Sequence, residues 1–184
     1  GISVHYLMLS DEARGLFHKA ISESGFGRNQ PTPLNVALGY GVKAAEANGI
    51  KGDGPDAAAA LRKLPIIGRE TPFPAATGLS DTTRPYPIID GRYIKDPIAD
   101  GYAKGRQAKV PLITGGNSNE ASLFRPTVAQ FDEITDRREQ MLALFDPKKT
   151  GNKLQIINDL VTAQRVTEPD RNLARQHVKL GAPV

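Results

Sequence analysis

Apolar residues at helical spacing dominate the chain and predict most of its secondary structure. Residues 1–9 are almost uniformly apolar, which is typical of the interior of a buried helix. Further helices are predicted where apolar side chains recur every three or four residues, over 11–20, 34–47, 56–64, 97–104, 127–145, 154–161 and 167–180. Ser10 and Thr167 are placed to cap two of these helices, because a hydroxyl oxygen accepts from the first unpaired N–H groups of a helix.

Short apolar runs predict a small number of strands between these helices. Residues 20–24 and 110–114 each run directly into glycine, as buried strands that end in a turn do. Residues 87–94 predict two short strands around an Asp-Gly turn, and residues 182–184 look like the start of another strand. Helices that alternate with strands indicate an α/β fold with a mainly parallel sheet.

The predicted sheet is small for the number of helices. Such a sheet would leave open edges and uncovered helix faces, so we expect the chain to be part of a larger domain. Its 184 residues, 39% apolar and 24% charged, still suffice for one sizeable core. Loops are predicted at 26–33 and at 68–84, and the second is a long surface excursion of the kind that often carries function.

Composition excludes several classes of function. The net charge of +4 comes from scattered basic residues interleaved with acids, which argues against a nucleic-acid-binding surface. The absence of cysteine excludes disulfides, thiolate metal sites and a cysteine nucleophile within the chain. No apolar run reaches membrane-spanning length, and the first residues lack the order of a signal peptide. The cellular compartment stays open.

Glu120 is the first candidate for chemistry. It follows the predicted strand at 110–114 and a turn rich in glycine and asparagine. A carboxylate at the end of a buried strand can orient a histidine and stabilise the imidazolium that forms during acyl transfer. The alternative from the residues alone is a surface carboxylate at the start of a helix that begins at Ala121.

Serine and histidine do not complete a catalytic triad within the chain. Serines on or beside the first two buried elements are expected to be hydrogen-bonded structural groups, and none lies in a Gly-x-Ser-x-Gly turn; they are Ser3, Ser22 and Ser24. His5 lies in an apolar stretch and is expected to pack, whereas His18 and His177 are predicted on solvated helix faces. The three histidines have no metal-ligand spacing.

Three segments taken in order resemble one family. They are GISVHYLMLS with ARGLFHKAISESG at residues 1–25, PIIDG at residues 87–91, and the strand and loop at residues 110–124. Together they resemble the type-B carboxylesterases, the α/β-hydrolases that include cholinesterases and bacterial nitrobenzyl esterases. The likeness spans essentially all 184 residues. It implies a partial α/β-hydrolase fold that lacks the N-terminal and C-terminal portions, with residues 1–184 as the central part of one domain.

The resemblance also implies roles for single residues. Glu120 matches the acid of the family's Ser-His-Glu triad, and Ser24 matches a buried serine that hydrogen-bonds that acid. Substrate-pocket positions are implied for Leu123, Phe124, Thr83 and Arg84. Asn119 and Ala121 stand where the family usually has Asp and Gly beside the acid, a departure that keeps the carboxylate itself.

The implied activity is hydrolysis of a carboxylic ester without a metal or organic cofactor. The family's nucleophile elbow would end just before Gly1 and its histidine would follow Val184, so the isolated chain is expected to be inactive. The implied partners are a small-molecule carboxylic ester and the remaining segments of the same hydrolase domain, with no nucleic acid and no membrane span.

Two other functions stay open at this point. The same fold also serves as a non-catalytic interaction or adhesion module, because a fold does not fix a function. The chain could equally be a self-standing small binding domain that shares these motifs.

Overall fold

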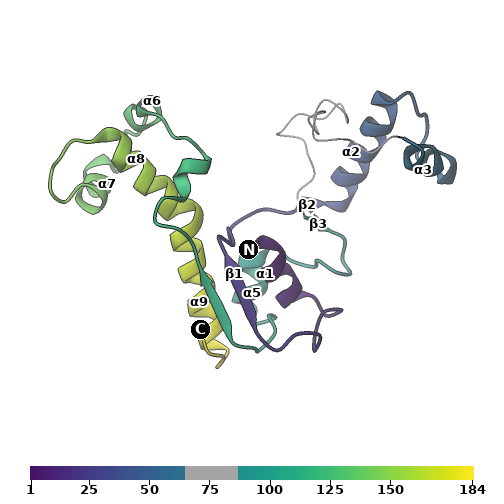
Figure 1. Cartoon of the computed structure of the whole chain (residues 1–184), viewed down its shortest axis with the longest axis horizontal. Helices are drawn as coiled ribbons and strands as arrows, with labels where there is room; N and C mark the ends of the chain where they lie inside the picture. Colours follow the sequence, from purple (N-terminus) through teal and green to yellow (C-terminus); the bar gives the residue numbers. More distant parts are fainter. Residues whose placement is uncertain (65–86) are drawn as a thin grey trace. The chain divides into compact units, whose positions relative to one another are not determined.

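The computed structural model describes residues 1–64 and 87–184 (Figure 1). It divides into two compact units, one made of residues 1–29 with 95–184 and the other of residues 30–94. The excursion predicted at 68–84, with Thr83 and Arg84 in it, lies outside the described residues.

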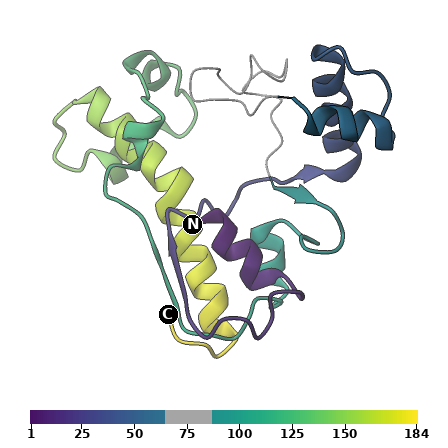
Figure 2. The ribbon, with the colours of Figure 1, turned by 45° about the vertical axis from the view of Figure 1, so that its right-hand side comes forward.

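The first unit is built around a pair of parallel strands. Its elements are α1 (Ile2–Leu9), β1 (Ala20–Glu23), α5 (Ile98–Ala103), β4 (Leu112–Gly115), the 3₁₀ helix η1 (Glu120–Leu123), α6 (Val128–Asp132), α7 (Arg138–Phe145), α8 (Lys153–Thr162), the π-helical segment η2 (Ala163–Thr167) and α9 (Glu168–Lys179). β1 and β4 lie side by side in both ribbon views (Figure 1, Figure 2). Helix α1 packs against β1, and α9 packs against β4.

The strand register fixes where the chain leaves the sheet. Ala20 is opposite Leu112 and Glu23 is opposite Gly115, so both strands end at the same edge. This confirms the two strands predicted from the apolar runs. On the other side of β4, the Leu112 N–H donates to the carbonyl of Pro183 at 3.1 Å. Residues 182–184 therefore run beside β4, although they are not a strand in the described structure.

A buried histidine joins the elements around β1. Nδ1 of His5 bonds the hydroxyl of Tyr102 on α5 at 2.8 Å, and Nε2 bonds the Ser22 hydroxyl at 2.8 Å. The Ser22 hydroxyl also donates to the carbonyl of Gly1 at 3.3 Å. Burial lowers the pKa of His5 to about 4, so the ring stays neutral near pH 7. As predicted, His5 packs in the interior, and the network ties α1 and α5 to β1.

The helix predicted over 11–20 is wrong. Ser10 ends α1 in an extended conformation, and only single turns follow it. Gly15 has φ +82°, which a right-handed helix does not tolerate. The carboxylate of Asp11 is held by Arg14 and Lys95 rather than by the N–H groups of a new helix.

The long helix predicted over 127–145 is two short helices, α6 and α7. Thr127 caps α6 in a reciprocal capping box with Gln130. Arg137 adopts a left-handed conformation with φ 53°, and this interrupts the helical path before α7 begins. Both helices nevertheless contribute to one buried cluster, in which Phe131 of α6 and Met141 of α7 pack with Ile156 and Ile157.

Thr167 does not cap the last helix, contrary to the prediction. It has helical φ and ψ, because α8 continues through η2 into α9 without a break. Pro169 lacks an N–H and cannot bond the carbonyl four residues earlier. The wider turn of η2 directly precedes it, with the N–H of Glu168 bonded five residues back to the carbonyl of Ala163.

The second unit consists of β2 (Thr32–Pro33), α2 (Leu34–Ala47), α3 (Pro55–Arg62) and β3 (Ile88–Ile89). β2 and β3 pair in parallel. The predicted end of α2 is confirmed: Asn48 is its C-cap, and Gly49 has φ +72°. The second strand predicted after the Asp-Gly turn is wrong. The Asp90 carboxylate instead accepts from the N–H groups of residues 92–94 and folds them into a loop.

Replacing Gly101 by alanine should destabilise the first unit. A Cβ at this position of α5 would lie 2.6 Å and 2.8 Å from the two δ-carbons of Leu9 on α1. We expect Gly101→Ala to lower the free energy of unfolding by about 1–3 kcal/mol, since overpacking forces the neighbour to move. Urea denaturation measures this change.

The matched control is Gly41→Ala in α2, where a Cβ would meet nothing within 4 Å. This substitution should raise the free energy of unfolding by about 0.5–1 kcal/mol through helix propensity. A Gly101→Ala protein as stable as its parent would show that α1 and α5 do not pack this closely.

Candidate active site

Glu120 is buried, which rules out the surface carboxylate considered above. Its residue is 3% exposed and lies at the start of η1, five residues after β4 ends. Oε1 accepts a hydrogen bond from the Ser24 hydroxyl. It also accepts from the backbone N–H of Asn117 at 2.8 Å and from the amide of the same residue at 3.1 Å.

These donors keep the carboxyl group of Glu120 ionised. The hydrogen bond from Ser24, followed by the N–H of Asn117, lowers the pKa of Glu120 below its ordinary value of 4.5, against the opposing effect of burial. All three bonds reach Oε1, and no described residue donates to Oε2. A buried carboxylate with one oxygen anchored and the other unbonded can accept an N–H from an imidazole.

Ser24 reaches Glu120 because of an unusual backbone conformation. Its N–H continues the strand pairing by donating to the carbonyl of Gly115 at 2.7 Å. Its φ of 53° then turns the chain out of β1. A left-handed conformation at a residue other than glycine costs about 1 kcal/mol or more and persists where surrounding contacts impose it. Here the strand pairing on one side and Glu120 on the other impose it.

Gly116 allows the loop after β4 to close around the carboxylate. A Cβ at this position would lie 2.4 Å from Cγ1 of Val166 on η2 and 3.2 Å from Oε1 of Glu120. No side chain fits between them, so the glycine gives the loop its close approach to both. The residue after it, Asn117, supplies two of the three donors to Glu120.

The start of α1 lies at the same edge of the strand pair. A Cβ on Gly1 would lie 2.5 Å from the carbonyl oxygen of Glu23 and 2.6 Å from the Cα of Gly25. Ser24, which lies between these two residues, bonds Glu120. The beginning of α1, the end of β1 and the Glu120 loop therefore meet in one place.

Of the two predicted pocket residues after Glu120, Leu123 is largely exposed and Phe124 is partly covered. Phe124 packs edge-on against Phe26 with ring centroids 5.9 Å apart, and the guanidinium of Arg165 lies 5.1 Å above its ring. Phe124 also lines a cavity of about 470 Å³ beside α8. Leu123 is 72% exposed. Both positions stay predictions as substrate contacts.

The histidines of the chain do not bond Glu120 in the described structure. His18 is exposed, as expected for a solvated position. His177 is fully buried, contrary to the prediction, and its Nε2–H donates to the carbonyl of Val110 at 2.7 Å. It occupies the face of α9 that packs on β4, which explains its burial.

Asp170 is a buried acid that the sequence analysis did not single out. It is 4% exposed and lies on α9. Burial raises the pKa of Asp170 to about 6, and the nearby charge of Glu120 contributes to the rise. A signal was available in the sequence: positions 170, 173 and 177 share one helix face, and the other two are Leu and His.

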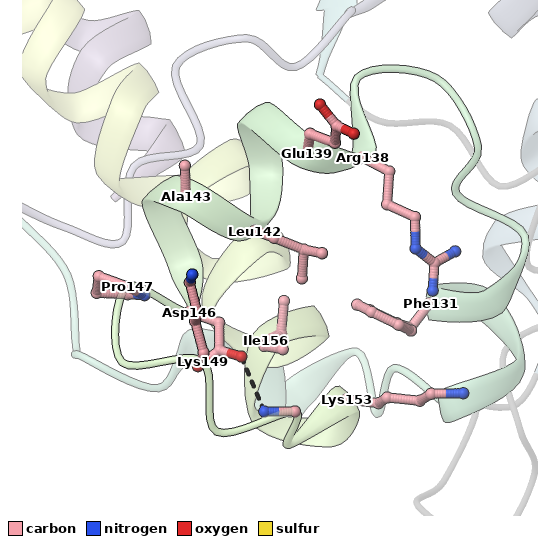
Figure 3. Close-up of a pocket in the computed structure, with 11 residues that line it drawn as sticks. Phe131, Arg138, Glu139, Leu142, Ala143, Asp146, Pro147, Lys149, Lys153 and Ile156 are labelled. Carbon is pink, nitrogen blue, oxygen red and sulfur yellow. Dashed lines mark hydrogen bonds between the residues drawn. The ribbon is translucent and has the colours of Figure 1, made fainter.

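A cavity of about 820 Å³ lies elsewhere, between α6, α7 and α8 (Figure 3). Phe131, Leu142 and Ile156 face into it, and Arg138 and Lys153 lie on either side of Phe131. The only buried acid in its wall, Asp146, has both oxygens occupied by Thr150 and Gly151. This cavity shares no residue with the Glu120 site and offers little for catalysis.

Two further properties follow from the described residues, 1–64 and 87–184. Within them, no three or more side chains of His, Asp or Glu gather as a metal site would require. None of their helices is both long enough and apolar enough to cross a bilayer.

Solved structures with the same fold include a bacterial carboxylesterase. The chain aligns with the carboxylesterase EST55 of Geobacillus stearothermophilus at a TM-score of 0.70 and 20% identity, covering 98% of this chain and 40% of that one. It aligns with EstA of Aspergillus niger at a TM-score of 0.64 and 19% identity, covering 96% of this chain and 38% of that one. The expected partial α/β-hydrolase fold is confirmed.

Sequence comparison leads to the same family. Human carboxylesterase 5A is 31% identical over 148 residues, which is 78% of this chain and 24% of that protein. The chain thus spans about a quarter of this relative's length. The model of the carboxylesterase family matches residues 1–182. Nearly the whole chain is matched, and the chain therefore belongs to the carboxylesterase family.

Proposed function

We propose that the chain is the central part of a serine carboxylesterase and that Glu120 is the acid of its catalytic triad. The observation that carries this proposal is the state of the carboxylate. Glu120 is buried and ionised, is anchored through Oε1 by Ser24 and Asn117, and keeps Oε2 for a further donor. A triad acid needs these properties to hold an imidazole in one tautomer.

In this proposal each step of ester hydrolysis has a group to perform it. A serine attacks the ester carbonyl, and a histidine takes its proton and returns it to the leaving alcohol, which leaves the acyl group on the serine. The same histidine then takes a proton from a water molecule that attacks the acyl-serine, and it returns this proton to the serine as the carboxylic acid departs. Backbone N–H groups stabilise the oxyanion in both steps. Oε2 of Glu120 accepts the other N–H of the histidine and stabilises the positive charge that develops on the ring. Ser24 keeps Glu120 in place while this charge appears and disappears.

The nucleophile and the base belong to other segments of the same hydrolase domain. The start of α1 lies against the end of β1 beside Glu120. A nucleophile elbow that led into α1 would present its serine at this edge, where ligands bind in open α/β sheets. The histidine would come from a segment that follows residue 184. Residues 1–184 by themselves are then expected not to hydrolyse esters.

The proposed substrate is a small carboxylic ester. Leu123, the last residue of η1, and Phe124, its C-cap, lie three and four residues after Glu120, and both expose apolar surface. They are suited to contact the acyl or alcohol group of an ester bound at the triad. Thr83 and Arg84 keep the same proposed role from the sequence alone.

The first test replaces Glu120 by glutamine in the full-length protein. The amide keeps the size of the side chain but loses the charge that holds the imidazolium. We expect kcat for a p-nitrophenyl ester to fall by about three to four orders of magnitude. Glu133→Gln, on the exposed surface between α6 and α7, is the matched control and should retain kcat. Turnover near the parent value in Glu120→Gln would contradict the triad role.

Labelling of the full-length protein by a fluorophosphonate separates the enzyme from a non-catalytic interaction module. The reagent reacts with a serine only when a base activates it. We expect stoichiometric labelling that is abolished when the protein is first unfolded. An unlabelled, correctly folded protein would favour the interaction module.

Replacing Ser24 by alanine should make stability depend on pH in a defined way. A pKa held below its ordinary value stabilises the folded state above pH 4.5, and this contribution disappears as the pH falls through the folded-state pKa. We expect Ser24→Ala to lower the free energy of unfolding by about 1.5–3 kcal/mol at about pH 7 and by much less at about pH 3.

Urea denaturation at the two pH values measures this difference. Ser122→Ala, an exposed position in η1, is the control that should change stability little at either pH. An equal loss of stability at both pH values in Ser24→Ala would mean that the hydroxyl does not act through the charge of Glu120.

A further inference from the structure

Arg165 carries a positive charge that the described part of the chain does not neutralise. It lies on η2, and its guanidinium is 5.1 Å above the ring of Phe124. No ion pair or hydrogen bond joins this guanidinium to any of residues 1–64 and 87–184. By contrast, Arg28 pairs with Glu168 at 2.5 Å although both side chains are more than half exposed. The side chain of Arg165 therefore has N–H donors to offer to a ligand.

Two contacts hold Arg165 close to η1, the short helix that begins at Glu120. The N–H of Ala121 donates to the hydroxyl of Thr162 at 3.1 Å, and Thr162 lies three residues before Arg165. Phe124, the C-cap of η1, contacts the guanidinium itself. Because a 3₁₀ helix rises about 2 Å per residue, Glu120 and Phe124 are only about 8 Å apart along η1. One small ester bound at Glu120 can therefore also reach the guanidinium.

The ring that carries Arg165 is held in place by a second aromatic residue. Phe26 packs edge-on against Phe124 with ring centroids 5.9 Å apart, and it follows Ser24 by two residues. Its φ of 45° is an outlier for a bulky side chain, and such outliers cluster at active sites and ligand-binding sites. The two segments joined by the hydrogen bond from Ser24 to Glu120 are therefore joined again by the two rings.

A cavity of about 470 Å³ extends from Phe124 and Arg165 along α8. This volume lies in the range of sites that bind small molecules. The two amides in its wall belong to Gln130 and Gln164, and none of the described residues that line it is acidic. The rest of its wall is apolar and consists of Pro126, Ile134, Ile157, Leu160 and Val161. The cavity thus offers an apolar surface together with a single positive charge.

We propose that Arg165 determines substrate specificity by binding a second, ionised carboxylate of the ester, which the preferred substrates carry at the end of an apolar chain. This inference rests on the proposed esterase function and names the substrate class for it. The apolar chain lies along the wall of the cavity beside α8. The carboxylate accepts two parallel N–H groups of the guanidinium, whose planar fork matches the geometry of a carboxylate.

The test compares esters that differ in charge, each hydrolysed by the full-length protein. On the acyl side, the anionic mono-p-nitrophenyl ester of adipic acid is paired with the neutral p-nitrophenyl hexanoate. On the alcohol side, the acetate ester of ω-hydroxyhexanoate is paired with the neutral hexyl acetate. The two pairs show which part of the ester carries the carboxylate that Arg165 binds.

We expect Arg165→Gln to lower kcat/KM about five- to thirtyfold for the anionic ester of one pair, because a charge-assisted contact with the substrate is lost. The loss should come mainly from a higher KM, since the contact is made equally in the bound substrate and in the transition state. The neutral ester of the same pair should change by less than about twofold. Arg165→Lys, which keeps the charge, should retain most of the preference for the anion.

Arg137→Gln is the matched control, because it removes the same charge from a side chain that is 80% exposed, and it should leave both esters unaffected. Salt gives an independent readout. Raising the ionic strength from about 0.02 M to about 0.5 M should weaken the preference of the parent protein for the anionic ester, because salt screens an exposed charge. The same change should have little effect on the Arg165→Gln protein.

Each outcome decides the question. Equal losses for the anionic and neutral esters in Arg165→Gln would mean that the arginine only packs on Phe124, and they overturn the inference. Unchanged rates for both anionic esters overturn it as well. A parent protein that hydrolyses none of the four esters overturns the esterase proposal and this inference with it. A parent that hydrolyses the neutral esters, and whose Arg165→Gln variant shows no selective loss, overturns only the role of Arg165.

Discussion

The parallel pairing of β1 with β4 is the constraint on which the candidate site depends. Because Glu23 lies opposite Gly115, the chain leaves both strands at the same edge and at the same level. Ser24 follows one strand and Gly116 the other, and the next turns bring the Ser24 hydroxyl onto Glu120 although 96 residues separate them. A register shift of one residue would turn every side chain of a strand to the opposite face and separate the pair.

Backbone positions that few residues tolerate complete the site. Ser24 has a left-handed φ, and Gly116 lies where any Cβ would meet Val166. Such positions cost free energy and are found where surrounding contacts over-determine them. Three donors on one carboxylate oxygen supply those contacts here. The π-helical segment η2 belongs to the same arrangement, because it places Val166 against Gly116 and allows Pro169 to lie within a continuous helical path.

Local patterns in the sequence predicted the elements that depend on local physics. The strands at β1 and β4 and the end of α2 at Gly49 follow from apolar runs and from glycine conformation, and Glu120 was located by the strand before it. Features that depend on distant partners were missed. The turns after Ser10 depend on Lys95, the burial of His177 depends on β4, and the donors of Asn117 appear only when the loop closes. The assignment of Ser24 to Glu120 came from the family resemblance, since nothing local links residues so far apart.

Asp170 and Glu120 show how position rather than residue type sets the state of a carboxyl group. Glu120 is almost fully buried, yet donors to one oxygen hold its pKa low. Asp170 is equally buried and lacks such donors, so burial and the neighbouring charge raise its pKa to about 6. The negative charge of Glu120 and the burial of Asp170 both disfavour a second charge, and the two carboxyl groups therefore differ in pKa. Hydrogen bonds from Ser24 and Asn117 therefore suit the position of Glu120 to hold a permanent charge, which burial alone would disfavour.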